Sequence, residues 1–356
     1  MRPLIVPFFI SHQGCPHQCV FCDQVKISGG REKLPSGADI IARIAACRAS
    51  AGFKPVEVAF YGGTFTNLPE EEQERLLLPL QPLLASGEVI SVRLSTRPDA
   101  VDYGSARFLA RMGVGTVELG VQSMDDEVLA LSGRGHKAAC TIEACRTLRR
   151  AGMTVGMQLM PGLPGDTGEK SLSSLESVLA LRPDFLRIYP TLVIAGTRLE
   201  ELYRSGGYTP LSLAEAVSLC KVMLHRALAE SVRVVRIGLQ PTAELETGGV
   251  IPAGPYHPAF RQLVEAELCY DLLRKLTSGI RADSPVTVFC APSRISDVIG
   301  QRRDNIKRLH REQGIKIASV KADPALSHLE IVIDHREGIM RGDIVRDMDY
   351  KRGALL

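Results

Sequence analysis

The chain has 356 residues, of which 45% are hydrophobic and 23% are charged, and its formal net charge is only +3. This length and composition are typical of a globular protein with one large domain and a smaller one, and exclude a disordered or fibrous chain. No segment holds the run of about eighteen apolar residues that a membrane-spanning helix needs, so no membrane association is expected.

Up to residue 240, apolar strand-like runs alternate with helical patterns. Strands are predicted at 4–10, 56–61, 89–95, 114–121, 154–160, 185–190 and 232–239. Helices are predicted between them at 38–51, 69–85, 126–131, 138–151, 169–181 and 212–230. Such alternation with mostly apolar strands indicates parallel βαβ units and a (β/α) barrel, in which chemistry collects at the C-terminal ends of the strands.

The rest of the chain divides into shorter regions. Residues 241–258 contain seven Gly or Pro and are predicted to be a connector, followed by a helix at 259–278. From 286 to 334 the pattern strand, helix, turn, helix, strand, strand predicts a small α/β unit. The predicted domains are 1–240 for the barrel, 241–280 for the connector and a helix packed on the barrel, 281–335 for the small basic unit and 336–356 for a charged tail.

Of nine cysteines, only Cys15, Cys19 and Cys22 are clustered, in the segment GCPHQCVFCDQ. The odd count and the scatter of the other six, in a chain too large to need disulfides, are typical of a cytoplasmic protein. The CxxxCxxC spacing allows zinc with His12 or His17 as the fourth ligand, but no second ligand pair accompanies it. An iron–sulfur cluster fits three thiolates better, because one of four irons then stays open for a substrate or cofactor.

This cysteine loop carries Phe21 before its last cysteine and follows the first strand of a (β/α) pattern, and so resembles the radical S-adenosylmethionine (SAM) superfamily. The resemblance implies a partial (β/α)6-type TIM barrel and a 4Fe-4S cluster on Cys15, Cys19 and Cys22, with SAM at the open iron. It further implies that an electron donor such as flavodoxin or ferredoxin drives reductive cleavage of SAM to a 5′-deoxyadenosyl radical. The motif leaves the catalytic residues unknown.

The glycine-rich turn after the second strand resembles the superfamily element at which the backbone meets the SAM amino group. Three further sites resemble the oxygen-independent coproporphyrinogen oxidase branch: the GVQS segment, the arginine of SGRGH and the polar residue before GLP. With a serine at the end of the third strand, the SAM-binding candidates are Gly62, Gly63, Thr64, Ser95, Gln122, Arg134 and Gln158. Gln158 stands where that branch has Asp, although an amide also hydrogen-bonds a hydroxyl. Arg134 has the fork geometry that favours carboxylate recognition.

Segments from 95 to 197, including STRPD, VELGVQS and MPGLPGD, resemble in order those of the radical SAM half of the Elongator catalytic subunit. The first cysteine gap is shorter than in that family, and no acetyltransferase domain follows, so wobble-uridine carboxymethylation by this chain alone is not expected. The nearest resemblance, with a GPYHPAF segment at 254–260, is to a shorter uncharacterised bacterial group. The sequence predicts a radical SAM enzyme acting on RNA, such as tRNA, or otherwise on a small metabolite. The alternative is a non-catalytic iron–sulfur or haem carrier, or an RNA-binding protein, on a radical SAM scaffold.

The small unit is basic, with eight Lys or Arg and three acidic residues between Arg294 and Lys321. Its VIGQRRDNIKRL segment resembles the helix–GxxG–helix core of KH domains, whose loop clamps the nucleic-acid backbone. Gly300 is the first glycine of this loop, and Arg303 stands at the position of the second glycine. There its side chain either blocks the close approach of the nucleic-acid backbone or supplies a phosphate contact of its own. The resemblance implies nucleic-acid contacts from Gly300, Arg302, Arg303 and Lys307. The other interpretation is a solvated basic helix face.

Overall fold

The computed structural model describes residues 3–28, 33–51, 54–242, 245, 248–282 and 285–350. The chain forms two compact units, Met1–Leu211 with Leu239–Pro255, and Ser212–Gly238 with Tyr256–Leu356. The first unit carries the cysteine loop, and the second carries the basic segment. Within the described ranges, no helix combines the length and the apolarity needed to cross a membrane.

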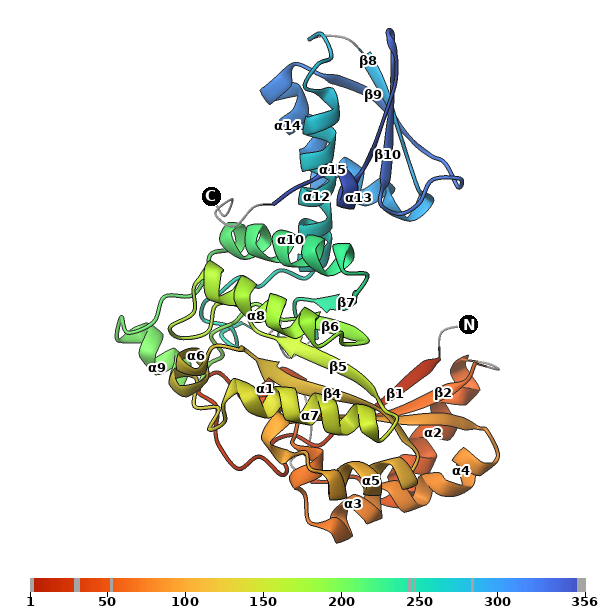
Figure 1. Cartoon of the computed structure of the whole chain (residues 1–356), viewed down its shortest axis with the longest axis vertical. Helices are drawn as coiled ribbons and strands as arrows, with labels where there is room; N and C mark the ends of the chain where they lie inside the picture. Colours follow the sequence, from red (N-terminus) through yellow and green to blue (C-terminus); the bar gives the residue numbers. More distant parts are fainter. Residues whose placement is uncertain are drawn as a thin grey trace. The chain divides into compact units, whose positions relative to one another are not determined.

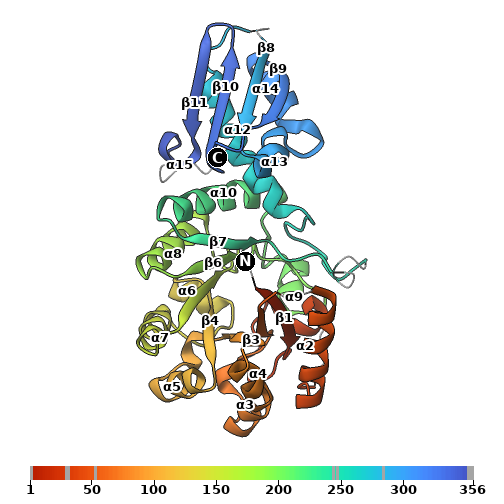
Figure 2. The same ribbon diagram turned by 90° about the vertical axis from the view of Figure 1, so that its right-hand side faces the viewer.

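A seven-stranded sheet with the order β1-β2-β3-β4-β5-β6-β7 organises the barrel. The strands are β1 (Leu4–Phe9), β2 (Val56–Tyr61), β3 (Val89–Thr96), β4 (Val114–Gln122), β5 (Thr154–Leu159), β6 (Phe185–Ile188) and β7 (Arg233–Ile237). Successive strands from β1 to β6 pair in parallel, and Figure 2 shows the sheet curling into an arc. The predicted partial TIM barrel is therefore confirmed.

Helices connect the strands of the first unit, and α2, α3, α5 and α7 lie on the outer side of the arc (Figure 2). The helices are α1 (Gln24–Ser28), α2 (Gly37–Ala51), α3 (Glu70–Leu77), α4 (Gln81–Ala85), α5 (Tyr103–Arg111), α6 (Asp126–Leu131), α7 (Ala138–Arg150), α8 (Gly168–Ala180) and α9 (Arg198–Arg204). The helix predicted at 69–85 is broken into α3 and α4 by a short 3-10 turn, because Pro79 and Pro82 lack the amide hydrogen that a continuous helix needs.

The second unit contains α10 (Leu213–Ala229) and α12 (Phe260–Thr277) together with a sheet of order β11-β10-β8-β9 (Figure 1). Its other elements are β8 (Pro285–Cys290), α13 (Ile295–Ile299), α14 (Asp304–Gln313), β9 (Lys316–Ala322), β10 (Glu330–His335), β11 (Gly338–Asp343) and α15 (Ile344–Asp347). β8 pairs in parallel with β9, and β10 lies antiparallel to both β8 and β11. The predicted small α/β unit is thus present.

Two predicted boundaries differ from the structure. The helix predicted at 259–278 is α12, which packs against α13, α14 and β10 and lies in the same compact unit as the small sheet, together with α10 and β7. The predicted charged tail, 336–356, instead contains β11 and α15, and only residues 351–356 lie outside the described part. The charges of β11 misled the prediction because they belong to a sheet edge, where Arg341 pairs with Glu330 at 2.8 Å.

Candidate iron–sulfur and cofactor site

The cysteine loop leaves β1 through a tight turn that is tied to the end of β2. His12 and Gly14 have φ values of +58° and +71°, a left-handed geometry that glycine adopts without strain. The amide of Thr64 donates to the carbonyl oxygen of Gln13 at 2.9 Å, and the amide of Gln24 donates to His12 Nε2 at 2.8 Å. The loop is therefore positioned by the neighbouring strand and not by its own sequence alone.

Each of the three thiols is contacted by a polar side chain, two of them from distant segments and one from the end of the cysteine loop itself. Cys15 Sγ lies 3.4 Å from Thr64 Oγ1, and Gln24 Nε2 donates to Cys22 Sγ at 3.4 Å. Arg134 Nη1 donates to Cys19 Sγ at 3.3 Å. Such contacts orient sulfur ligands and tune a bound metal centre.

The Cys22 thiol lies in surroundings that favour its protonated form. Burial, reinforced by the neighbouring Cys19, raises the pKa of the Cys22 thiol to about 12. A metal centre removes that proton, because thiolate ligation and deprotonation are coupled. The chemistry of this donor set therefore fits a thiolate-bound centre.

The described residues do not form a ready-made site for a single metal ion. Among them, no three His, Cys, Asp or Glu side chains lie close enough together to hold one ion. His12 Nε2 accepts a main-chain hydrogen bond from Gln24, which ties that ring nitrogen to the loop. Three cysteine thiols are, by ligand type, a donor set that also suits an iron–sulfur cluster.

The glycine pair after β2 is required by the cysteine loop itself. A Cβ on Gly63 would lie 2.4 Å from the oxygen of Gln13 and 2.5 Å from that of Ile10. Gly62 has a φ of +93°, and a Cβ there would lie 3.2 Å from Gln24 Oε1. The glycines at this turn are therefore needed in part because the turn packs closely against the cysteine loop.

The polar candidates on β4 and β5 come together at the strand ends. Gln158 Nε2 donates to Gln122 Oε1 at 3.0 Å, and Gln122 has a φ of +67° beside a register shift in the β4–β5 pairing. A Cβ on Gly120 would lie 2.8 Å from Gln122 Nε2, so this glycine makes room for the amide. On β3, Ser95 Oγ donates to the oxygen of Phe60 at 3.4 Å.

A charged network in the first unit was missed by the sequence analysis. Arg93 bridges two acids, with Nη2 2.7 Å from Glu57 Oε2 and Nη1 2.9 Å from Glu118 Oε1. Arg187 also donates to Glu118, and the Tyr61 hydroxyl donates to Glu118 Oε1 at 3.2 Å. The alternation of charged residues within apolar strands was the available signal, because alternate positions share one sheet face.

Strand register connects this network to the candidate amides. Gln158 is paired with Arg187, and Gly120 with Gln158, and Glu118 lies two residues before Gly120 on β4. The same sheet face therefore carries the charged groups and Gln158, and Gln122, beyond the register shift, joins it through its hydrogen bond to Gln158. Burial and the carboxylate of Glu118 raise the pKa of Tyr61, so this hydroxyl stays protonated.

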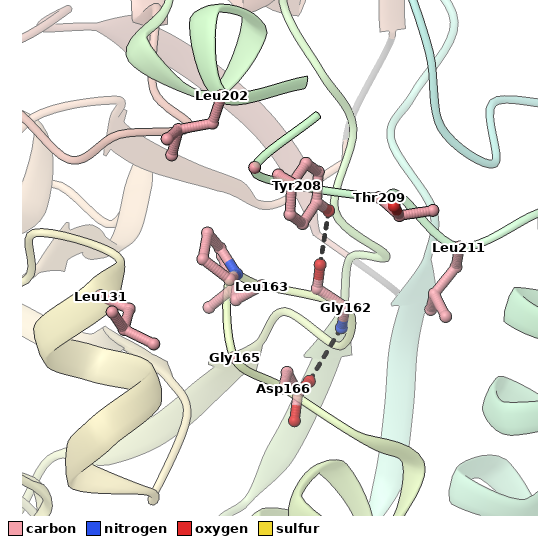
Figure 3. Close-up of a pocket in the computed structure, with 11 residues that line it drawn as sticks. Leu131, Gly162, Leu163, Gly165, Asp166, Leu202, Tyr208, Thr209 and Leu211 are labelled. Carbon is pink, nitrogen blue, oxygen red and sulfur yellow. Dashed lines mark hydrogen bonds between the residues drawn. The ribbon is translucent and has the colours of Figure 1, made fainter. Parts of the chain in front are cut away.

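A cavity of about 340 Å³ adjoins the loop that follows β5 (Figure 3). Tyr208 Oη donates to the oxygen of Gly162 at 2.6 Å, and the amide of Gly162 donates to Asp166 Oδ2 at 2.8 Å. Leu163 and Tyr208, which line the cavity, also pack in the apolar cluster that contains Cys19 and Phe21. The PGLPGD segment thus helps to support the cysteine loop.

The basic loop of the second unit is exposed and has an unusual backbone. Gly300, Arg302 and Arg303 have φ values of +74°, +51° and +64°, and Arg302, Arg303 and Lys307 are exposed. Arg303 stands where the KH loop has its second glycine, and it adopts the left-handed geometry that glycine favours.

Not all basic residues of this segment are free to meet a ligand. Arg294 is buried and lies 3.0 Å from Asp297, with a second ion pair to Glu265. Arg308 is paired with Glu267. The positive charge available at the surface is therefore smaller than the sequence count suggested.

Residues 9–177 match the family model described as "Radical SAM superfamily", and residues 183–269 match its "Radical_SAM C-terminal domain". The two matches together cover most of the chain, and the curled parallel sheet and cysteine loop agree with them. This protein therefore belongs to the radical SAM superfamily, and the matches indicate an enzyme.

Curated relatives and a solved structure refine this placement. The chain is 29% identical over 225 residues to an uncharacterized protein of Methanocaldococcus jannaschii, covering 60% of this chain and 69% of that protein. It is 35% identical over 138 residues to a tRNA uridine(34) acetyltransferase of Methanocaldococcus infernus, covering 38% of this chain but only 26% of that protein. The archaeal Methanocaldococcus infernus Elp3 with an N-terminal deletion aligns with a TM-score of 0.58 at 22% identity, covering 97% of this chain and 75% of that one. At that identity the structural match shows the shared fold.

Proposed function

We propose that this chain is a radical SAM enzyme in which Cys15, Cys19 and Cys22 hold a 4Fe-4S cluster. The observation that carries the proposal is the convergence of Thr64, Gln24 and Arg134 on the three thiols, one side chain to each sulfur. When bound, the cluster and SAM supply reductive cleavage of SAM to a 5′-deoxyadenosyl radical, by an electron from a donor such as flavodoxin or ferredoxin. The protein supplies orientation and exclusion of water.

The SAM-binding residues proposed on this basis are those at the strand ends. The paired amides of Gln122 and Gln158 present polar groups suited to the hydroxyls of a ribose. Gly62 and Gly63 keep the turn after β2 free of side chains, while Thr64 and Ser95 add hydroxyls beside it. Arg134 completes the proposed set, although it is already hydrogen-bonded to Cys19.

Reductive SAM cleavage is the test of this function. After anaerobic reconstitution with iron and sulfide, the protein given dithionite and SAM should form 5′-deoxyadenosine, measured by mass spectrometry. Changing Cys15, Cys19 and Cys22 to Ala should abolish the product, whereas the control Cys47→Ala, on helix α2, should leave it unchanged. A fully loaded protein that never cleaves SAM would support the alternative of a non-catalytic carrier.

We further propose that the substrate is RNA, with tRNA as the first class to examine. Two observations support it: the similarity to a relative that is a tRNA uridine(34) acetyltransferase, and the exposed cations Arg302, Arg303 and Lys307. Phosphate contacts by such side chains make binding depend steeply on salt.

Matched charge-reversal variants test the RNA proposal. Changing Arg302, Arg303 and Lys307 together to Glu should weaken tRNA binding and flatten its salt dependence. The control is the same change at Arg107, Arg146 and Arg150, which are exposed on helices α5 and α7. Equal affinity of the wild type and the first triple variant would remove the RNA assignment and favour a small metabolite.

A further inference from the structure

The guanidinium of Arg134 is buried and has no carboxylate partner. Its residue is only 5% exposed, and it forms no ion pair with an acidic side chain in the part of the chain that the structure describes. Its hydrogen bonds run instead from Nη1 to Cys19 Sγ at 3.3 Å and from Nη2 to the oxygen of Gly120 at 2.6 Å. A buried cation is costly unless an anion compensates it, and the only anion-forming partner in these bonds is the Cys19 sulfur.

A second buried arginine holds Arg134 in place. Arg97 is 4% exposed, and its Nη2 donates to the main-chain oxygen of Arg134. The same guanidinium makes a bidentate pair with Asp99, at 2.9 Å from Nε to Oδ1 and 2.9 Å from Nη2 to Oδ2. The planar fork of Arg97 can make these contacts together, whereas a lysine ammonium cannot match that geometry.

The turn that carries Arg134 is also fitted to the cysteine loop. Gly133 and Gly135 on either side have φ values of +67° and +71°. A Cβ on Gly135 would lie 2.4 Å from the ring of His17, and the amide of Val20 donates to the oxygen of Ser132 at 3.1 Å. The position of Arg134 relative to Cys19 is thus set by packing on both sides.

We infer, on the basis of the proposed function, that Arg134 donates a charge-assisted hydrogen bond to the ligating sulfur of Cys19 and thereby raises the reduction potential of the cluster. Arg97 is the positioning residue for this contact. Reduction adds one electron to the cluster, and a fixed positive charge with a hydrogen bond to the sulfur stabilises the more negative state. This role differs from binding the SAM carboxylate, because it operates before SAM enters.

The midpoint potential of the SAM-free cluster distinguishes these roles. The cluster is titrated with dithionite, which supplies one electron to each cluster, and electron paramagnetic resonance measures the reduced fraction at each potential. The Arg134→Met protein, which loses charge and donor, should titrate at a clearly more negative potential than the wild type. Arg134→Lys, which keeps the charge, should lie between them. The control Arg146→Met, at an exposed position of α7, should match the wild type.

An unchanged potential in Arg134→Met would overturn the inference. If Arg134→Met and the wild type share one SAM-free potential while the variant binds SAM less tightly, Arg134 serves the SAM carboxylate and the inference is overturned. If the wild type itself assembles no 4Fe-4S cluster, the proposed function fails instead. The two failures are therefore distinguishable in one set of samples.

Arg97 gives an independent test if Arg134→Met does not fold. Arg97→Lys keeps the charge but cannot bridge Asp99 and the oxygen of Arg134, so its potential should shift in the same direction by a smaller amount. An unchanged potential in Arg97→Lys with intact iron content would remove the positioning role. Loss of the cluster in both Lys variants would assign the two arginines to folding and overturn the inference.

Discussion

The cysteine loop and the basic loop use similar backbone geometry in opposite surroundings. Both contain left-handed residues, His12 and Gly14 in the first and Gly300 and Arg303 in the second. The first loop is held by Thr64 and Arg134 from distant segments, as the fixed ligands of the proposed metal centre would require. The second presents exposed cations on an α/β scaffold, which suits a long polyanion met by several weak contacts.

The two loops also differ in how they are anchored. The cysteine loop is fixed along its length by Thr64, Gln24 and Arg134. The basic loop is fixed at its base by Asn305, whose Nδ2 donates to the oxygens of Asp297 at 3.0 Å and Ala266 at 2.9 Å. Substitutions in the first loop should therefore affect folding and cofactor binding, whereas those in the second should affect binding alone.

The largest expected effect is at Gly63. The change Gly63→Ala places a Cβ against the main-chain oxygens of Gln13 and Ile10, and should lower the free energy of unfolding by about 1–3 kcal/mol. The control Gly248→Ala meets nothing within 4 Å and should stay within about 0.5 kcal/mol of the wild type. Urea unfolding of the metal-free proteins measures both, and equal stability would show that the loop adjusts to the added methyl group.

The next expectation concerns acid stability. Burial, helped by the nearby Arg134 charge, lowers the pKa of His136 from 6.5 to about 4. The unfolded chain therefore binds more protons than the folded one between these values, and stability falls as the pH is lowered through that window. The change His136→Asn should reduce this pH dependence, whereas His310→Asn, at an exposed site on α14, should not. Urea unfolding at pH 7 and pH 5 gives the comparison, and parallel pH profiles would contradict it.

A smaller effect is expected on SAM affinity. The change Gln158→Leu leaves Gln122 Oε1 without its donor and should weaken SAM binding about tenfold, as expected for the loss of one hydrogen bond. The same substitution at Gln301, in the basic loop, should leave SAM affinity unchanged. Calorimetry on the reconstituted proteins measures this, and full SAM affinity in Gln158→Leu would remove Gln158 from the proposed site.

The smallest effect is expected at Arg303. Because its φ is +64°, Arg303→Gly should fold normally. If the side chain supplies a phosphate contact, as proposed, RNA binding should weaken and its salt slope should fall by roughly one. Tighter RNA binding would instead show that the arginine blocks the approach of the nucleic-acid backbone.

Much of the fold could be predicted from the sequence because its strands are short, apolar and regularly separated. Helices α1, α5 and α9, with 5, 9 and 7 residues, were missed, because segments of one to three turns give only a weak periodic signal. The place of β11 was missed because its charges resemble those of a tail. Similarly, Glu118 was not predicted as a site neighbour, since its three partners come from strands far apart in the chain.

The sequence by itself determined the three clustered cysteines, the parallel barrel and the family resemblance, because spacing and periodicity are local properties of the chain. Only the tertiary structure decided what surrounds each sulfur. It placed Arg134 against Cys19 and Gly63 against the main chain of the cysteine loop, and it paired Arg294 and Arg308 with acids of α12. These contacts join residues 29 to 115 positions apart, and such pairings depend on how strands and helices pack.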